Sequence, residues 1–178
     1  CLIRISAREN VCGGIELEDA IAAAKLYEAA GVDAIDVSQG CYDALAYTVP
    51  PYYYPQKVNV YNASQIKKNV NVPVVVAGRI SHPDLAEEVL QNGMADFISL
   101  GRPQLADPDY VKKTMEGRTD EIVRCIACDQ GCVGRMFAGY GVSCIFEPAT
   151  GNEKEVVITP AETKKKLLVV GGGPAGLE

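Results

Sequence analysis

The chain has no tryptophan, a single histidine and no long hydrophobic run. No stretch approaches the ~20 apolar residues that cross a bilayer as a helix, so no membrane-spanning segment is expected. Acidic residues outnumber basic ones by 23 to 17, and the net charge of −6 argues against a nucleic-acid partner, which needs a basic face. The histidine, His82, precedes Pro83 at an expected helix start, where we expect capping or solvent exposure. A Ser-His-Asp hydrolase therefore has little support.

What is present is the composition of a globular protein. Hydrophobic residues make up 48% and charged residues 22% of 178 residues, which is enough chain to bury a core. The sequence starts CLIRIS, without an initiator methionine, and stops at GGGPAGLE, where a helix should begin. We therefore expect an internal fragment of a longer protein.

Short β-type runs alternate with amphipathic helices over the first hundred or so residues. The predicted strands are 2–6, 32–38, 72–77 and 96–100, and the predicted helices are 17–30, 62–70, 83–93 and 107–116. Asn62 is the expected cap of the second helix. This alternation predicts an α/β fold with a parallel sheet, either half of a (β/α)8 barrel or part of a doubly wound sheet. In both architectures ligands bind at the carboxyl ends of the strands.

Several polar residues lie at or near those expected strand ends. VVVAGRI and FISLGRP each finish a strand with Gly-Arg, and Gly78-Arg79 with Gly101-Arg102 therefore predict a phosphate site. Arg4, inside the apolar run LIRIS, needs either a carboxylate partner or an anionic ligand, and the sequence leaves both open. In the tyrosine-rich loop 39–57, Tyr42 lies closest to a strand end and is the candidate proton donor.

Four cysteines follow in the spacing C-x2-C-x3-C-x11-C. They are Cys125, Cys128, Cys132 and Cys144. Three clustered ligands and a fourth further along favour an iron–sulfur cluster. A four-cysteine zinc site usually has two CxxC pairs and only one is present, while disulfides would need an oxidising compartment. Both alternatives stay open on spacing alone.

A glycine-rich motif closes the sequence. Gly171, Gly173 and Gly176 fit G-x-G-x-x-G directly after the apolar run 167–170, which we expect to form a buried strand. Such a loop lets a pyrophosphate approach the backbone at a helix start, so dinucleotide binding is predicted.

Together these segments resemble a known family. The matching pieces, in order, are IRIS, AGVDAIDVSQGCYD, VPVVVAGRI, ADFISLGRP, RCIACDQGCVGRMF and LLVVGGGPAGLE. They resemble the old yellow enzyme-like NADH:flavin oxidoreductases that contain an iron–sulfur cluster, relatives of 2,4-dienoyl-CoA reductase, 2-enoate reductase and trimethylamine dehydrogenase. The resemblance covers essentially the whole chain.

The resemblance implies four segments. Residues 1–117 would be the C-terminal half of an FMN-binding TIM barrel, 118–150 a [4Fe–4S] segment, 151–166 a linker, and 167–178 the first strand of a Rossmann-like domain for FAD and NAD(P)H. Its site residues would be Arg4 beside the flavin ring, Gly78, Arg79, Gly101 and Arg102 at the FMN phosphate, Cys125, Cys128, Cys132 and Cys144 on the cluster, and Gly171, Gly173 and Gly176 at the FAD pyrophosphate.

The implied function is electron transfer from NAD(P)H through FAD and the cluster to FMN, for reduction of an activated C=C bond in a small molecule by a cytoplasmic enzyme. Dienoyl-CoA reductases place a catalytic histidine where this chain has Tyr42, which indicates a tyrosine donor of the enoate reductase type. An amine dehydrogenase or NADH oxidase is the alternative within the family, and a zinc-stabilised scaffold is the alternative of another class. The full-length enzyme could form a homo-oligomer, and half a barrel alone is expected to be inactive.

Overall fold

The structure, a computed structural model, describes residues 1–157 and 159–177. Its elements are, in chain order, β1 (Leu2–Ser6), α1 (Leu17–Ala29), β2 (Ala34–Ser38), the 3-10 helix η1 (Tyr42–Ala44), α2 (Leu45–Thr48), α3 (Val60–Lys67), β3 (Val74–Val76), α4 (Pro83–Gln91), β4 (Phe97–Ile98), α5 (Arg102–Ala106), α6 (Tyr110–Met115), the 3-10 helix η2 (Thr119–Glu121), the π-helix η3 (Gln130–Gly134), α7 (Arg135–Phe137) and α8 (Pro174–Leu177). No helix in these described ranges is long and apolar enough to cross a membrane.

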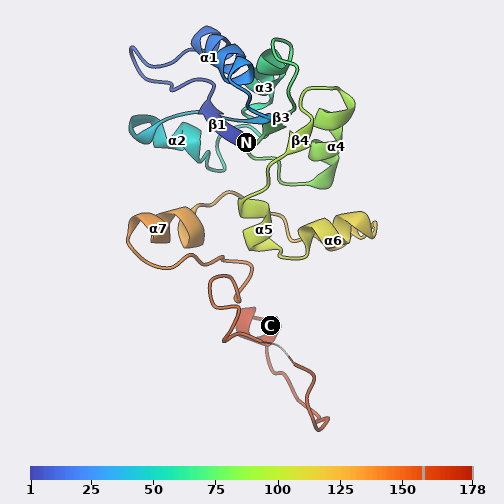
Figure 1. Cartoon of the computed structure of the whole chain (residues 1–178). Helices are drawn as coiled ribbons and strands as arrows, with labels where there is room; N and C mark the ends of the chain where they lie inside the picture. The colour runs from blue at the N-terminus through green and yellow to red at the C-terminus, as the bar shows by residue number, and fades with distance from the viewer. Residues whose placement is uncertain (158, 178) are drawn as a thin grey trace.

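The four strands form one parallel sheet in the order β1-β2-β3-β4 (Figure 1). Each strand lies beside the one before it, and a helical crossover joins each pair. A doubly wound sheet instead reverses direction at a switch point, with strands added on both sides of the first. The α/β fold with a parallel sheet is thus confirmed, and the strand order is the one that a (β/α)8 barrel uses.

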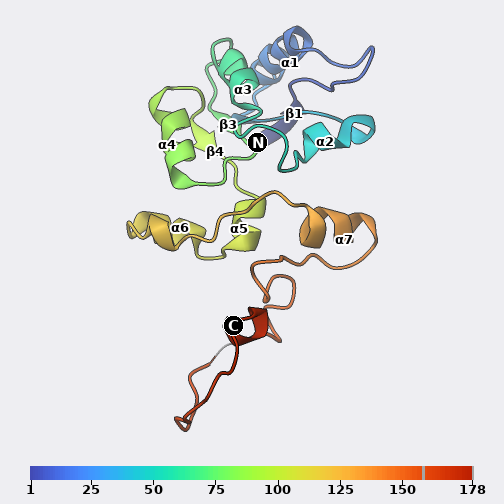
Figure 2. The same cartoon turned by 180° about the vertical axis from the view of Figure 1, so that it is seen from behind.

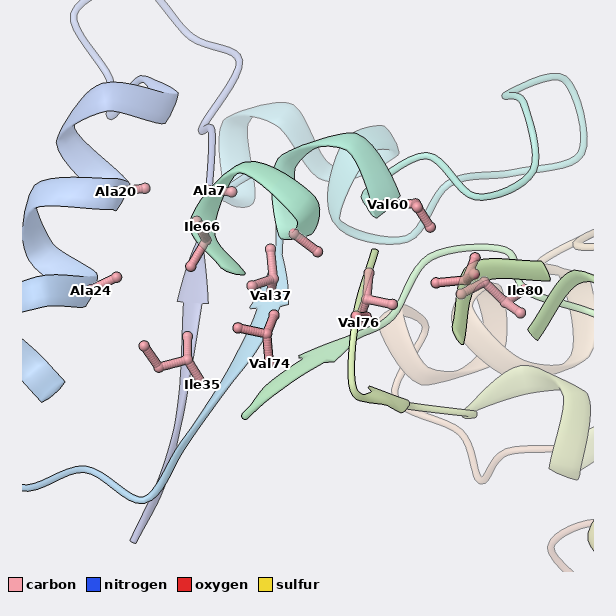
Figure 3. Packing of buried hydrophobic residues seen from close by; sticks show 13 residues of the cluster. Ala7, Ala20, Ala24, Ile35, Val37, Val60, Ile66, Val74, Val76 and Ile80 are labelled. Carbon is pink, nitrogen blue, oxygen red and sulfur yellow. The ribbon is translucent and has the colours of Figure 1, made fainter. Parts of the chain in front are cut away.

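Helices cover one face of this sheet. Ile35 and Val37 of β2 and Val74 and Val76 of β3 are fully buried, because alternate strand residues point to the same side. Figure 3 shows them facing α1 and α3. The small residues of α1 that pack on this core, Ala20 and Ala24, let the helix lie close. Each buried valine or isoleucine contributes about 1.5–3 kcal/mol through removal from water.

The opposite face of the sheet is open within the described residues. Leu2 and Phe97 each remain 58% exposed on it, although both are apolar strand residues. The register pairs Arg4 with Asp36, which places the candidate flavin-ring arginine on this same face. In a closed barrel this face would be the interior, filled by side chains of further strands.

Two helix starts test the expected caps. His82 precedes α4, and its Nδ1 accepts a 3.4 Å hydrogen bond from the Asp84 N–H, so capping is confirmed. Solvent exposure, the other expected role, is wrong, because His82 is only 7% exposed. The cap expected at Asn62 is wrong, because α3 already begins at Val60. Lys57 adopts a left-handed φ of 60° and its carbonyl accepts from the Val60 N–H at 3.0 Å, which starts the helix earlier.

Beyond β4 the chain forms a second group of short helices, α5 to α7, and then extends away from the sheet (Figures 1 and 2). The buried strand expected at 167–170 is wrong: Leu168 is 90% exposed and the described residues there form no strand. A parallel strand needs a neighbouring strand for its hydrogen bonds, and the described chain places none beside this segment. Residues 158 and 178 lie outside the described ranges.

Candidate functional site

A pocket of about 340 Å³ opens at the carboxyl ends of the strands. It is lined by strand-end and loop residues, among them Arg4, Ser38, Asn59, Gly78, Arg79, Gly101, Arg102 and Cys125. The structure therefore brings together all five residues that the sequence suggested for a flavin: Arg4, Gly78, Arg79, Gly101 and Arg102. They converge because parallel strands all end at one edge of the sheet.

Of the two alternatives for Arg4, the structure shows the carboxylate partner, Asp36. The Arg4 Nε and Nη2 each lie 2.8 Å from the Asp36 Oδ2, across the β1–β2 register. The same side chain lines the pocket and is more than half exposed, whereas Asp36 is buried. The carboxylate thus holds the guanidinium in place while leaving it accessible to a ligand. The sequence marks Asp36 only as an acidic residue inside an apolar strand. Its pairing with Arg4 depends on the register of β1 and β2, which the structure shows.

Gly78 and Arg79 form a tight turn at the end of β3. Gly78 has a φ of +123°, and a Cβ there would lie 2.8 Å from the Asn59 Nδ2, so only glycine fits. Arg79 has a left-handed φ of 53°, and its Nη1 donates to the carbonyls of Tyr52, at 3.0 Å, and Tyr54. Burial and then the nearby charge of Arg102 lower the pKa of Arg79. The guanidinium stays protonated, so Arg4, Arg79 and Arg102 place three cations at the pocket and favour an anionic ligand.

Arg102 lies between this pocket and the stretch that contains Cys125, Cys128, Cys132 and Cys144, which we call the cysteine segment. Gly101 precedes α5, and the Arg102 Nη1 donates to the Pro50 carbonyl at 3.0 Å and to the Asp129 Oδ1 at 2.5 Å. Both charged side chains of this pair are largely buried. Asp129 was missed by the sequence reasoning, since nothing marks which acidic residue beside a cysteine will turn inward.

The four cysteines line a second cavity that adjoins the first. Cys125, Cys128, Cys132 and Cys144 all border it, and Arg102 and Cys125 belong to both cavities. All four thiols are free of disulfide bonds. Backbone N–H groups approach two of the sulfurs: Ala127 donates to the Cys125 Sγ at 3.4 Å and Phe146 to the Cys144 Sγ at 3.5 Å. Such donors stabilise negative charge on sulfur.

The backbone of this segment is bent to bring the cysteines together. Ala127 and Asp129, on either side of Cys128, have left-handed φ values of 53° and 59°. A Cβ on Gly131 would lie 2.7 Å from the Ser143 carbonyl oxygen, so glycine allows the two arms of the segment to touch. Strained backbone of this kind is retained where the surroundings or a ligand require it.

The four cysteines border one cavity but do not form a compact site for a single ion. Within the described residues, no three His, Cys, Asp or Glu side chains are close enough together to hold one metal ion. A tetrahedral zinc would hold its sulfurs about 3.8 Å apart, given Zn–S bonds near 2.3 Å. A cluster of four irons spreads its thiolates around a larger body. Burial raises the pKa of Cys125 and Cys132, so the positive charge of a metal would be needed to hold both as thiolates.

Two groups of predicted site residues lie elsewhere. Tyr42 begins η1 and is 89% exposed, and it is not among the residues that line the pocket. The described glycines of the C-terminal motif form a tight turn of their own, in which a Cβ on Gly176 would lie 2.2 Å from the Gly171 carbonyl oxygen. Gly171 has a φ of +115°, and Gly173 directly precedes α8. None of these glycines lines the strand-end pocket.

With this geometry in place, comparison with known proteins identifies the family. Residues 1–121 match the NADH:flavin oxidoreductase / NADH oxidase family, and the chain belongs to it. It is therefore part of a flavin-dependent oxidoreductase family whose members act on small molecules.

Relatives align over nearly the whole chain but over only part of themselves. The chain is 44% identical to an NADH oxidase of Thermoanaerobacter brockii, over 98% of this chain and 27% of that protein. It is 40% identical to a cinnamate reductase of Clostridium sporogenes, over 93% of this chain and 25% of that protein. The solved structure of a 2-naphthoyl-CoA reductase superposes with a TM-score of 0.92 at 34% identity, covering 99% of this chain and 27% of that one. The chain thus spans about a quarter of the length of these relatives.

Proposed function

We propose that the chain is a segment of an oxidoreductase that uses NAD(P)H to reduce an activated C=C bond. Residues 1–117 form the C-terminal half of the FMN-binding barrel, 118–150 hold a [4Fe–4S] cluster, 151–166 are a linker, and 167–178 open a domain for FAD and NAD(P)H. The observation behind this proposal is that the strand-end pocket and the cysteine cavity adjoin and share Arg102 and Cys125.

In the strand-end pocket, arginine side chains would contact the two ends of a bound flavin. Arg79 and Arg102 bind the phosphate of FMN, with the Gly78 and Gly101 turns letting it approach the backbone. Arg4, held by Asp36 at 2.8 Å, presents its charge to the ring and favours negative charge there. The open, apolar face of the sheet would then be covered by the first half of the barrel.

In the second cavity, Cys125, Cys128, Cys132 and Cys144 are the cluster ligands. When bound, FAD, the cluster and FMN would supply a path for electrons from NAD(P)H to the substrate. The residues of this chain hold the two sites beside one another: the Arg102–Asp129 pair joins the phosphate side of the pocket to the cysteine segment.

The proposed class of substrate is inferred from the relatives. A cinnamate reductase at 40% identity favours an unsaturated acid or its derivative as substrate, and the NADH oxidase at 44% identity favours oxygen as the competing acceptor. Tyr42 is proposed as the proton donor. Its ring is exposed and is not among the residues that line the strand-end pocket of this segment.

Anaerobic purification of the full-length protein tests the proposal. We expect about four irons per chain, bound flavin, and NAD(P)H-dependent reduction of an aryl-substituted enoate. A colourless protein with a single zinc would overturn it in favour of the scaffold alternative. Rapid NAD(P)H consumption with oxygen but none with enoates would favour the oxidase.

A further inference from the structure

Asn59 is an unexplained polar residue in the wall of the strand-end pocket. It lies just before α3, where an asparagine usually caps the helix by accepting from its first free N–H groups. Here the side chain makes no capping hydrogen bond. The residue is only 2% exposed, and its Oδ1 has no partner among the described residues. Leaving a buried acceptor unpaired destabilises the fold, so the arrangement calls for an explanation.

The position of the carboxamide supplies one. Asn59 lines the pocket together with Arg4, Ser38 and Gly78. Its Nδ2 lies against the open side of Gly78, only 2.8 Å from where a Cβ would be, so the absence of a side chain at Gly78 makes room for it. A half-turn about the last side-chain bond exchanges Oδ1 and Nδ2, so either end can face the pocket.

We propose that Asn59 is a ligand-binding residue whose carboxamide hydrogen-bonds the uncharged part of the bound flavin, a ribityl hydroxyl or the ring imide. This inference rests on the proposed flavin site. A carboxamide offers both a donor and an acceptor, and a hydroxyl or an imide edge matches both. A phosphate dianion offers acceptors only and would leave the amide oxygen unpaired, and Arg79 and Arg102 already provide its charge partners.

The test compares flavin affinity in flavin-depleted full-length protein, measured by quenching of flavin fluorescence. Asn59→Ala and Asn59→Leu should each raise the Kd for FMN about tenfold, the effect of losing one buried hydrogen bond. Asn62→Ala, on the same helix but outside the pocket lining, is the matched control and should leave the Kd unchanged. A loss with the leucine variant alone would be a steric effect and would overturn the proposal.

Two further measurements separate binding of the uncharged part of the flavin from binding of its phosphate, and ligand binding from a purely structural role. Riboflavin, which lacks the phosphate, should lose affinity by the same factor as FMN in both Asn59 variants, and a loss confined to FMN would overturn the assignment to the uncharged part. The melting temperature of the flavin-free Asn59→Leu protein should equal or exceed that of the unsubstituted protein, because an unpaired buried group is removed. A clear drop would indicate a structural role instead. If the unsubstituted protein binds no flavin, the proposed function fails; if it binds and the variants bind equally, only this inference fails.

Discussion

The guanidinium of Arg102 donates to the Asp129 carboxylate at 2.5 Å and joins the strand-end pocket to the cysteine segment. Arg102 belongs to α5 and follows the last strand, whereas Asp129 lies between the second and third cysteines. Both side chains are largely buried, so each is the main charge partner available to the other. The pair therefore connects the linings of the two proposed redox sites.

Removing one member of this pair should cost more than removing both. Arg102→Met leaves the Asp129 carboxylate buried and unpaired, with an expected loss of about 3–5 kcal/mol in the free energy of unfolding. The double variant Arg102→Met/Asp129→Leu should lose less than Arg102→Met alone, and therefore less than the sum of the two single variants. Chemical denaturation of the full-length protein measures this, with Arg118→Met, in an exposed ion pair, as the control near zero. Additive losses would show that the two side chains are not coupled.

Arg79 should bind the phosphate of FMN selectively. Arg79→Ala is expected to raise the Kd for FMN by about ten- to a hundredfold, the effect of one charge-assisted hydrogen bond, and to change the Kd for riboflavin much less. Titration of the flavin-depleted full-length protein with both ligands measures the ratio. Arg8→Ala is the control, since Arg8 pairs with Glu16 outside the pocket. Equal losses for both flavins would place the phosphate elsewhere.

The cysteines of the second cavity should differ from the others in iron binding. Cys125→Ser is expected to lower the iron content clearly below about four per chain and to bleach the visible absorbance, because one corner ligand is lost. Cys12→Ser, at an exposed position outside both cavities, should change neither. Iron analysis of anaerobically purified protein gives the result. Unchanged iron in Cys125→Ser would remove this residue from the ligand set.

The position of a residue along a strand can be predicted from the sequence, whereas contacts between residues distant in sequence cannot. Strand periodicity and the Gly-Arg endings located the sheet and five pocket residues, because position along a parallel strand determines which edge a residue reaches. Asp36, Asn59 and Asp129 were missed, since each acquires its role only through a neighbour distant in sequence: the β1–β2 register, the Gly78 turn and the Arg102 side chain. The strand expected at 167–170 failed for a related reason. Its apolar residues describe what the segment can bury, and burial requires neighbours that the described chain does not place there.

Acid should weaken the attachment of the cysteine segment through Asp107. Burial alone would raise the pKa of this carboxyl, but hydrogen bonds from the Lys113 Nζ, at 2.7 Å, and from the Val123 N–H, at 2.9 Å, outweigh it and lower the pKa below its usual value. Val123 leads directly into Cys125, so Asp107 ties α6 to the start of the cysteine segment.

The sign of the pH effect follows from that lowered pKa. The folded carboxyl titrates below the unfolded value near 3.9, so its stabilisation is present above about pH 4 and is lost as the pH falls through the folded pKa. Asp107→Asn should destabilise the full-length protein at pH 7 and should flatten the fall in stability between about pH 5 and pH 2. Denaturation midpoints across this range measure both effects. Glu153→Gln is the control: the lowered pKa of its exposed carboxyl comes from the hydrogen bonds of local backbone N–H groups, and solvent screens their effect on stability. If the stability of the Asp107→Asn protein fell as steeply with acid as that of the unsubstituted protein, other carboxyls would set the acid sensitivity.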